Sequence, residues 1–213
     1  MNLNQLFSEC KGCKACHLRY DAATQVVPWE TGDNPEIMFV SEAPGMQEDK
    51  TGLPYQGAAG KLFTKMVTAL GYKRGEDLHV TNIVKCRPSK NRTPTYDERH
   101  VCANKWLLRE IFSVNPKIII CLGLASGQFL LDKPDTKMKE LHGTIYTKTL
   151  MYPNIPGDKL AGTEKRFQIG VTYHPSYIIY NGYSPAVKRL IWNDVTSILD
   201  NVGVKYTSRN QHT

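Results

Sequence analysis

The sequence has no apolar stretch long enough to cross a membrane. Its longest apolar run, Ile118 to Leu124, has the length of a strand and falls well short of the roughly 18 residues that a bilayer requires. The N-terminal residues MNLNQLF also lack the basic start and the apolar block of a secretion signal. These absences predict an intracellular protein that is neither secreted nor attached to a membrane.

Internal repeats and low-complexity tracts are absent as well, which argues against repeat and fibrous architectures. The 213 residues, of which 41% are hydrophobic and 22% charged, suffice for one sizeable globular domain and would be cramped for two. We therefore expect a single domain over residues 1–204, followed by a polar C-terminal tail over residues 205–213.

Acidic residues are fewer than basic ones, 20 against 27, so the chain carries a formal net charge of +7. Such an excess favours a polyanionic partner, because basic side chains that contact phosphates release condensed counterions. Nucleic acid is the partner that this suggests, although a generally basic surface would have the same composition.

Six cysteines are present, and in a reducing compartment we do not expect structural disulfides among them. The spacing Cys13-x-x-Cys16, together with Cys86 and Cys102 downstream, is typical of a metal site with four thiolate ligands. Zinc and an iron–sulfur cluster both suit such ligands, and the spacing does not separate them.

The alternative for any one cysteine is that it packs as a small buried apolar residue. We favour this interpretation for Cys121, which lies inside an apolar strand. Cys10 stays open, because Cys10-x-x-Cys13 has the same spacing as the predicted ligand pair.

Short apolar runs alternate with helical patterns along most of the chain, which is typical of a parallel sheet with crossover helices. The first run is continuously apolar, as expected for a strand that is covered on both faces. Four strands are predicted, over residues 37–40, 79–84, 117–122 and 167–173.

Helical periodicity is clearest over residues 59–70, and Gly71 ends the pattern. Thr95 and Glu98 form a capping box that predicts the start of another helix, and Ser184-Pro185 predicts the start of the last one. A short helix is expected over 125–131, and a long surface loop at about 148–166. The predicted fold class is α/β, a three-layer α/β/α sandwich around a central four-stranded parallel sheet.

The segment after the first predicted strand is a candidate site, because ligands of parallel sheets bind outside the carboxyl ends of the strands. The glycines that follow allow close backbone approach, and Gly57 and Gly60 begin a helix whose free N–H groups suit a phosphate. The segment also carries three acids, and the alternative to a functional role is that they are solvated turn residues, the commoner fate of such a run: Glu42, Glu48 and Asp49.

Two further side chains are expected at the same edge of the sheet. His174 follows the fourth predicted strand, and Pro175 restricts the turn after it. Asn82 lies in the second strand, and its amide can both donate to and accept from the edge of a base. A satisfied structural histidine and a loop-binding asparagine are the alternatives.

Basic residues crowd around Cys86, and Tyr96 lies among them. Beside the predicted crevice such a stretch suits a DNA backbone, and a solvated charged surface is the alternative. The basic residues are Lys85, Arg87, Lys90, Arg92 and Arg99.

Taken in order, these motifs resemble those of the family 4 uracil-DNA glycosylases, the iron–sulfur branch of the uracil-DNA glycosylase superfamily. The family pattern combines C-x-x-C-x-L, G-E-A-P-G-x-x-E-D, G-x-P-F-x-G-x-x-G, T-N-x-V-K-C-R-P, N-R-x-P, a fourth cysteine and H-P-S. Each motif alone is weak, but the whole set in this order is specific, and the match runs from Cys13 to about Leu199. The matching segments here are 13–18, 41–49, 52–60, 81–88, 91–94, Cys102 and 174–176.

The resemblance implies a monofunctional hydrolase of base excision repair, with uracil-containing DNA, single- or double-stranded, as its partner. Such an enzyme flips uracil out of DNA and hydrolyses the N-glycosidic bond, which leaves an abasic site. A monomer is expected. The resemblance also implies a [4Fe–4S] cluster with a structural role, on Cys13, Cys16, Cys86 and Cys102.

Residue roles are implied by motif position. Tyr55 would stack on the extruded uracil, Asn82 would read its N3–O4 edge, and His174 would stabilise the negative charge that develops on O2. Glu42, with Glu48 as the weaker candidate, would position the attacking water or stabilise the cationic sugar. The other implied contacts are Ala43 for uracil, and Gly57, Gly60, Lys85, Arg87, Arg92 and Ser176 for DNA.

Some positions depart from the family pattern. Ser41 stands where glycine is usual and Tyr55 where phenylalanine is usual, while His142 and Tyr180 stand where arginines are typical. These departures motivate an alternative function, a non-catalytic protein that keeps the fold and binds uracil or DNA. A zinc-stapled α/β protein that acts on a small nucleotide is the third possibility.

Overall fold

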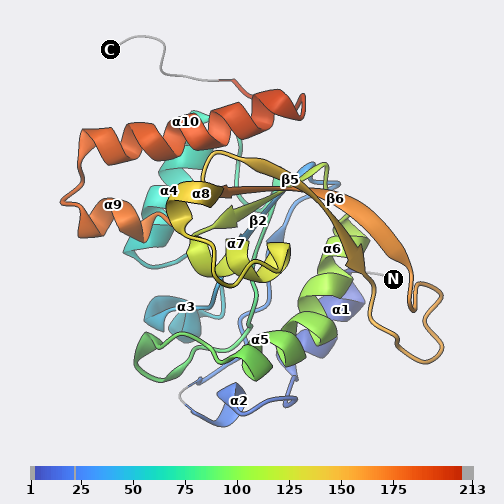
Figure 1. Ribbon diagram of the computed structural model, residues 1–213. Helices are drawn as coiled ribbons and strands as arrows, with labels where there is room; N and C mark the ends of the chain where they lie inside the picture. The colour runs from blue at the N-terminus through green and yellow to red at the C-terminus, as the bar shows by residue number, and fades with distance from the viewer. Residues whose placement is uncertain (1–2, 22, 208–213) are drawn as a thin grey trace.

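The computed structural model describes residues 3–21 and 23–207, which form a six-stranded mixed sheet with helices on both faces (Figure 1). The strand order is β1-β3-β2-β4-β6-β5. The strands are β1 (Glu30–Thr31), β2 (Ile37–Ser41), β3 (Leu78–Asn82), β4 (Ile118–Leu122), β5 (Ile145–Met151) and β6 (Glu164–Thr172).

The four central strands are parallel, and they are the four that the sequence predicts. Ile37 of β2 pairs with Leu78 of β3 on one side and with Ile118 of β4 on the other. Ile119 of β4 pairs in turn with Ile169 of β6. The carboxyl ends of these strands therefore meet at one edge of the sheet, as expected for crossover connections.

The prediction of a four-stranded sheet is incomplete, because an antiparallel strand is added at each edge. β1 has only two residues, too few to show any periodicity. β5 is seven residues long, but only Leu150 in it is buried. An edge strand that faces solvent needs no apolar run, so the hydrophobic pattern did not reveal it.

Helices cover the sheet in two layers. The α-helices are α1 (Leu3–Lys11), α2 (Leu18–Asp21), α3 (Met46–Thr51), α4 (Ala58–Ala69), α5 (Tyr96–Cys102), α6 (Leu108–Val114), α7 (Leu124–Leu131), α8 (Met138–Leu141), α9 (Ser176–Tyr180) and α10 (Pro185–Asn201). A 3₁₀ turn, η1 (Ser89–Asn91), precedes α5, and a π-helical segment, η2 (Ala103–Leu107), joins α5 to α6.

Alternate residues of the central strands face two separate cores, since successive side chains of a strand point to opposite faces. Ile37 and Phe39 of β2 belong to the core that also contains residues of α4 and α10. Met38 and Val40 belong to the core that contains residues of α1, α5, α6 and α7. The three-layer α/β/α sandwich predicted from the sequence is thus confirmed.

The predicted capping box is also present, because the Thr95 hydroxyl accepts a hydrogen bond from the Glu98 N–H at 3.2 Å and the Glu98 carboxylate accepts one from the Thr95 N–H at 2.7 Å. Pro185 opens α10 as expected, but the Ser184 side chain makes no capping hydrogen bond.

The surface loop predicted at 148–166 is shorter in the structure. Its two ends are the paired arms of a β-hairpin, with Lys148 opposite Phe167 and Met151 opposite Glu164, so only residues 152–163 connect strands. Tyr152 is buried and its hydroxyl donates to Asp158 at 2.6 Å, which ties the connection to the hairpin. The prolines and glycines that indicate a loop, Pro153, Pro156, Gly157 and Gly162, all lie within this connection.

Residues 205–207 of the predicted polar tail pack against the domain. The Tyr72 hydroxyl donates to the Lys205 carbonyl at 2.5 Å, and the Thr207 N–H donates to the Leu70 carbonyl at 3.0 Å. The rest of the predicted tail, 208–213, lies outside the described residues. Over the described ranges, no helix combines the length and the apolarity needed to span a bilayer.

Candidate active site

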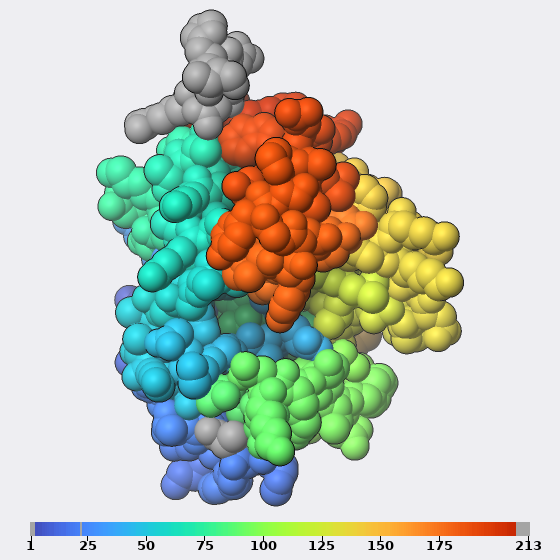
Figure 2. Space-filling view, turned by 90° about the vertical axis from the view of Figure 1, so that its left-hand side faces the viewer, coloured from blue at the N-terminus to red at the C-terminus, as the bar shows by residue number. Residues whose placement is uncertain are grey.

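A cavity of about 500 Å³ opens at the carboxyl ends of the parallel strands. Figure 2 shows the hollow between the segment that contains α9, in orange, and the segments of α3 and α5, in blue and green. Its lining combines the loop after β2, the start of α4 and the ends of β3, β4 and β6. Among the lining residues are Glu42, Ala43, Glu48, Tyr55, Gly57, Gly60, Asn82, Arg92, His174 and Ser176. Segments that are far apart in the sequence, each predicted to carry site residues, thus meet in one pocket.

Tyr55 lies at the wall of this cavity and is 6% exposed. Its ring packs against Phe63 with centroids 4.6 Å apart, and its hydroxyl hydrogen-bonds to Ser41 at the end of β2. Burial raises the pKa of the Tyr55 phenol, so the hydroxyl stays protonated. Ser41 and Tyr55, two of the four residues that depart from the family pattern, are therefore partners, and together they hold the ring in one orientation.

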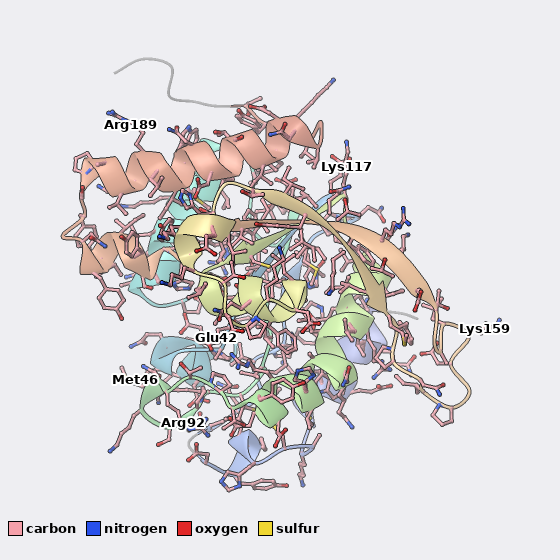
Figure 3. The ribbon with its side chains drawn as sticks, viewed as in Figure 1. Glu42, Met46, Arg92, Lys117, Lys159 and Arg189 are labelled. Atoms are coloured by element: carbon pink, nitrogen blue, oxygen red, sulfur yellow. The ribbon has the colours of Figure 1, made fainter. Side chains whose placement is uncertain are left out.

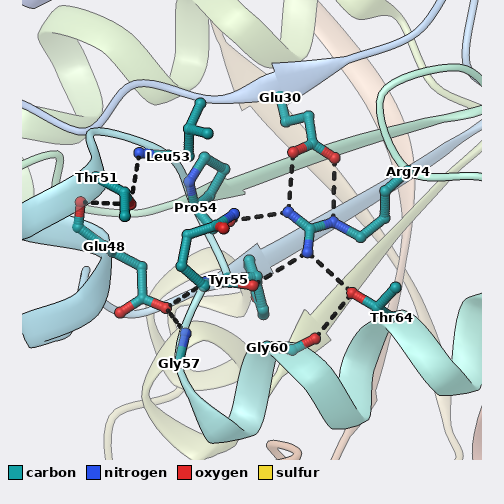
Figure 4. Close-up of polar contacts among 11 residues, drawn as sticks. Glu30, Glu48, Thr51, Leu53, Pro54, Tyr55, Gly57, Gly60, Thr64 and Arg74 are labelled. Carbon is teal, nitrogen blue, oxygen red and sulfur yellow. Dashed lines mark hydrogen bonds and ion pairs between the residues drawn. The ribbon is translucent and has the colours of Figure 1, made fainter.

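Arg74 holds the backbone of the same loop, a role that no pattern in the sequence predicts. Its guanidinium donates to the carbonyl oxygens of Pro54 at 2.8 Å and Tyr55 at 3.1 Å (Figure 4). Two further hydrogen bonds, of 2.9 and 3.0 Å, join it to both carboxylate oxygens of Glu30. No local motif marks Arg74, because its partners, which also include the Thr64 hydroxyl at 2.9 Å, lie 10 to 44 residues away in the sequence.

Glu48 acts as an anchor between two loops. One carboxylate oxygen accepts from the N–H groups of Gln56 at 2.7 Å and Gly57 at 2.9 Å (Figure 4). The other accepts from the Gly45 N–H at 3.1 Å. The Gly57 N–H that was predicted to suit a phosphate is therefore already bound to a carboxylate of the protein. Gly60 is needed for packing, since a Cβ there would overlap the Tyr55 carbonyl.

Glu42 is the acid of this loop that remains available for chemistry. Asp49 is buried and accepts hydrogen bonds from Thr24 and Gln25, so it fixes the chain before β1. The Glu42 carboxylate lies 3.7 Å from the Arg99 guanidinium and lines the cavity, between α7 on one side and α3 and α5 on the other (Figure 3). Burial raises its pKa, and the charge of Arg99 partly offsets that rise.

His174 presents a defined tautomer to the cavity. The Ser176 N–H donates to His174 Nδ1 at 3.1 Å, so the proton of the neutral ring resides on Nε2. The Ser176 hydroxyl lies 2.7 Å from the same Nδ1. Burial lowers the pKa of His174 to about 4, with a small opposing effect from Glu48, so the imidazole is neutral at physiological pH.

Asn82 ends β3 and is 3% exposed at the wall of the cavity. Within the described part of the chain, its side-chain amide makes no hydrogen bond. The amide lines the cavity, so its N–H groups and its oxygen are available to a polar ligand there.

Lys85, predicted as a DNA contact, points into the protein and is 1% exposed. Its ammonium lies 2.5 Å from the Glu110 carboxylate and donates to the carbonyl of Asn82 at 2.7 Å and the hydroxyl of Thr81 at 2.5 Å. The prediction of a DNA contact is therefore wrong for Lys85, because its ammonium is buried and paired inside the protein. No local sequence pattern reveals this pairing, since Glu110 lies on α6.

The other predicted basic contacts lie near the mouth of the cavity. Arg92 lines the cavity and forms two hydrogen bonds of 2.7 and 2.8 Å with Glu98, and it lies 3.3 Å from Asp21. Arg87 is half-buried and donates to the Asn91 side chain at 2.7 Å. Both guanidiniums are thus held in place at this end of the sheet.

The four predicted cysteine ligands lie in or against one core, that of α1, α5 and α6. Burial raises the pKa of Cys86 to about 12, and the neighbouring Cys16 and Cys13 add to the rise. Hydrogen-bond donors also point at the sulfurs, among them the Trp106 indole N–H, 3.1 Å from Cys13 Sγ. Among the described residues, no three metal-binding side chains are already assembled as a site. The donor chemistry nevertheless fits a thiolate-bound group, because four soft ligands share one apolar environment.

The chain is an α/β/α protein with a polar cavity at the carboxyl ends of its parallel strands, and comparison with known protein families identifies its family. The family model of the uracil DNA glycosylase superfamily matches residues 28–196, most of the chain. The chain therefore belongs to the uracil DNA glycosylase superfamily.

Within the superfamily, the chain is similar over most of its length to proteins named type-4 uracil-DNA glycosylases. The protein of Archaeoglobus fulgidus is 35% identical over 84% of this chain and 84% of its own. That of Saccharolobus solfataricus is 36% identical over 96% and 88%, and that of Sulfurisphaera tokodaii is 38% identical over 92% and 83%. These relatives confirm the family resemblance that the motifs indicated.

Proposed function

We propose that this protein is a uracil-DNA glycosylase that releases uracil from DNA by hydrolysis and leaves an abasic site. The observation that carries the proposal is the meeting of Tyr55, Asn82 and His174 in one cavity at the ends of the parallel strands. Full-length relatives that carry this name support the same activity.

The cavity suits a single extruded pyrimidine. The Tyr55 ring, fixed by Ser41 and Phe63, offers an aromatic face for stacking. The Asn82 amide supplies the donor and the acceptor that the N3–O4 edge of uracil requires, and Ala43 lines the same cavity. Each base enters only after it leaves the stack, because the glycosidic bond is shielded in a duplex.

His174 contributes a neutral donor to the departing base. With Nδ1 occupied by the Ser176 N–H, the Nε2–H faces outward as a donor to uracil O2, where negative charge develops as the bond breaks. A neutral imidazole suits this role, because a buried imidazolium would need a counter-ion before the substrate binds. The low pKa of His174 keeps it in that state.

Glu42 positions the attacking water or stabilises the positive charge that develops on the sugar. Its carboxylate accepts no hydrogen bond from the described residues, although Arg99 lies within ion-pair distance. Glu48, the weaker candidate, is saturated by three backbone N–H groups, so its contribution is to hold the loop in place.

The thiolates of Cys13, Cys16, Cys86 and Cys102 would hold a [4Fe–4S] cluster, with zinc as the alternative. Such a group would join the N-terminal segment to α5 and to the end of β3, and its role would be structural. Supporting donors are present, since the N–H groups of Leu18 and Arg19 point at Cys16 and that of Lys85 at Cys102. DNA phosphates would be contacted by Arg87, Arg92, Ser176 and the backbone at Gly60, whereas the Gly57 N–H is already bound to Glu48.

An oligonucleotide with a single deoxyuridine tests the proposal. We expect the protein to release the base, so that alkali then breaks the strand at that position. His174→Ala should lower kcat by about a hundredfold or more, the usual cost of losing a donor to a developing anion, with an unchanged melting temperature. His100→Ala is a matched control, because this histidine is half-buried but does not line the cavity.

Tight binding of the deoxyuridine oligonucleotide without an abasic product would instead favour the non-catalytic alternative. The hydroxyl pair of Ser41 and Tyr55 is the observation behind that alternative, because it adds a polar group to the wall that faces the base.

A further inference from the structure

A group of tyrosines surrounds α9, which begins two residues after His174. Tyr180 is 84% exposed and lines the mouth of the cavity, and Tyr177 is 37% exposed on the same helix. Figure 2 shows the orange segment that contains α9 overhanging the hollow. Large aromatic side chains in such exposed positions beside a binding cavity indicate a partner with an aromatic or apolar face.

Tyr177 is the outermost member of a braced column of rings. Its ring stacks on Tyr173 with centroids 4.6 Å apart and an angle of 21° between the planes. Tyr173 lies 5.1 Å from the His142 ring, whose Nδ1 is 3.0 Å from the Asp194 carboxylate. Asp194 is 6% exposed and accepts a further hydrogen bond from Thr172 at 2.9 Å.

This bracing means that the position of Tyr177 does not depend on a ligand. A ring that is already fixed loses little conformational entropy when another ring stacks on it, which favours binding. Within the described ranges, no side-chain hydrogen bond holds the hydroxyl of Tyr177 or Tyr180. Their rings, rather than their hydroxyls, are therefore what these residues offer to a partner.

We propose that Tyr177 and Tyr180 stack with unpaired bases next to the extruded uracil, so that single-stranded DNA is the preferred substrate. The inference rests on the proposed function, because it takes the cavity as the place where uracil binds. A strand whose uracil occupies the cavity must leave past its mouth, and Tyr180 lies there. Base–aromatic stacking is tolerant of sequence, since every base has a π-face.

An unpaired base next to uracil gains more stacking energy from the rings of Tyr177 and Tyr180 than a base that is still paired in a duplex. In a duplex the neighbouring bases keep their partners and most of their stacking, so their faces are not available to α9. In a single strand the neighbours are free, and uracil also leaves its position without breaking a base pair. Arg92, at the same mouth, supplies a cation for the backbone of that strand.

The first experiment compares kcat/KM for one deoxyuridine sequence as a single strand and as a duplex. We expect the wild-type protein to prefer the single strand. Tyr180→Ala and Tyr177→Ala should each lower the single-strand to duplex ratio by about tenfold, in line with the usual contribution of one stacked base. Tyr180→Phe and Tyr177→Phe should retain the ratio, because they keep the ring.

Tyr183→Ala is the matched control. Tyr183 is 50% exposed and close to α9 in sequence, but it lies beyond the end of the helix, and Lys188 already lies over its ring at 6.0 Å. The ratio should not change in this variant. Melting temperatures of all the variants separate a loss of stacking from a loss of folding.

A second experiment removes the base instead of the side chain. Single-stranded substrates carry an abasic analogue on the 5′ or the 3′ side of deoxyuridine. When the missing base is the one that stacks on Tyr180, kcat/KM of the wild-type protein should fall by about tenfold. The same substrate should have little further effect on Tyr180→Ala, because that variant already lacks the stacking contact.

Additive effects of the two removals would overturn the inference. A larger loss of kcat/KM in Tyr180→Ala on the duplex than on the single strand would also overturn the inference. Tyr180 would then act by filling the gap that the extruded uracil leaves in a double helix. Failure of the wild-type protein to release uracil from either substrate would contradict the proposed function itself. Normal release of uracil with an unchanged single-strand to duplex ratio of kcat/KM in every variant would contradict only the proposed stacking of bases on Tyr177 and Tyr180.

Discussion

At the scale of single residues, three carboxylates follow β2 and hydrogen bonding divides their roles. Glu48 and Asp49 are saturated by backbone and hydroxyl donors, and they hold the loop in place. Glu42 keeps a carboxylate that faces the cavity, near one cation, Arg99. The electrostatics of the proposed reaction therefore centre on Glu42 and on the neutral ring of His174.

Arg99→Gln should move the acid limb of the pH profile of kcat/KM to higher pH. Burial raises the pKa of Glu42 and Arg99 lowers it, so removal of the cation leaves the carboxylate protonated at a higher pH. Lys117→Gln is the control, since it removes the same charge far from the cavity (Figure 3). An acid limb that stays in place would show that Glu42 is not the ionised group that turnover requires.

His174 should make stability depend on pH below neutrality. Its pKa is about 4 when folded and 6.5 by ordinary values, so the unfolded chain binds an extra proton between these limits. The free energy of unfolding should therefore fall as the pH is lowered from about 6.5 to about 4, and be unaffected by this group above that window. Denaturant titrations of the wild type and His174→Asn should diverge across the window, and parallel curves would contradict the burial effect.

At the scale of elements, the segment from β3 to Cys86 links the base-binding edge to the cysteines. Asn82 ends the strand at the cavity, and Lys85 binds its carbonyl from the interior. Lys85 also pairs with Glu110, which lies 3.2 Å from His79 within the same buried network. The network fixes where β3 stops, and thereby where the Asn82 amide lies.

Lys85→Met should destabilise the fold by about 3–5 kcal/mol, because it leaves the Glu110 carboxylate buried without its cation. Adding Glu110→Gln should recover part of that loss. The salt dependence of DNA binding should not change in Lys85→Met, whereas Arg92→Gln should reduce the slope of log K against log salt by about 1. A reduced slope in Lys85→Met with full stability would return Lys85 to the set of DNA contacts.

At the scale of the whole molecule, the four cysteines proposed as ligands lie on separate segments of the chain that meet at one core. Cys13 and Cys16 precede β1, while Cys86 follows β3 and Cys102 ends α5. A thiolate-bound group would close these segments on one another, and its binding energy would add to the stability of the folded state.

Cys86→Ser should abolish bound metal and lower the melting temperature by more than about 10 °C, since about 1 kcal/mol shifts a chain of this size by 2–4 °C. Cys121→Ser is the control, because Cys121 is equally buried but lies within β4. Metal analysis and absorbance near roughly 400 nm, which iron–sulfur charge transfer produces, give the readout. Full metal content in Cys86→Ser would exclude this residue as a ligand, and colourless protein with zinc would favour the zinc alternative.

Much of the fold could be predicted because its signals are local. The central strands are short apolar runs, and the Thr95 cap and the Gly71 stop are settled within a few residues of the chain. The edge strands could not be predicted in this way, since β1 is too short and β5 faces solvent. Solvent-exposed pairing depends on the neighbouring strand rather than on the composition of the strand itself.

The sequence by itself determined which residues stand at the ends of the parallel strands, because strand periodicity and chain order place Glu42, Asn82 and His174 at one edge of the sheet. Only the tertiary structure decided what each side chain does there. It turned Lys85 inward to Glu110, saturated Glu48 with backbone donors, and brought Arg74 to the Tyr55 loop. These outcomes depend on partners that are distant in the chain, and a charge is exposed or paired only once the fold brings such a partner within a few ångströms.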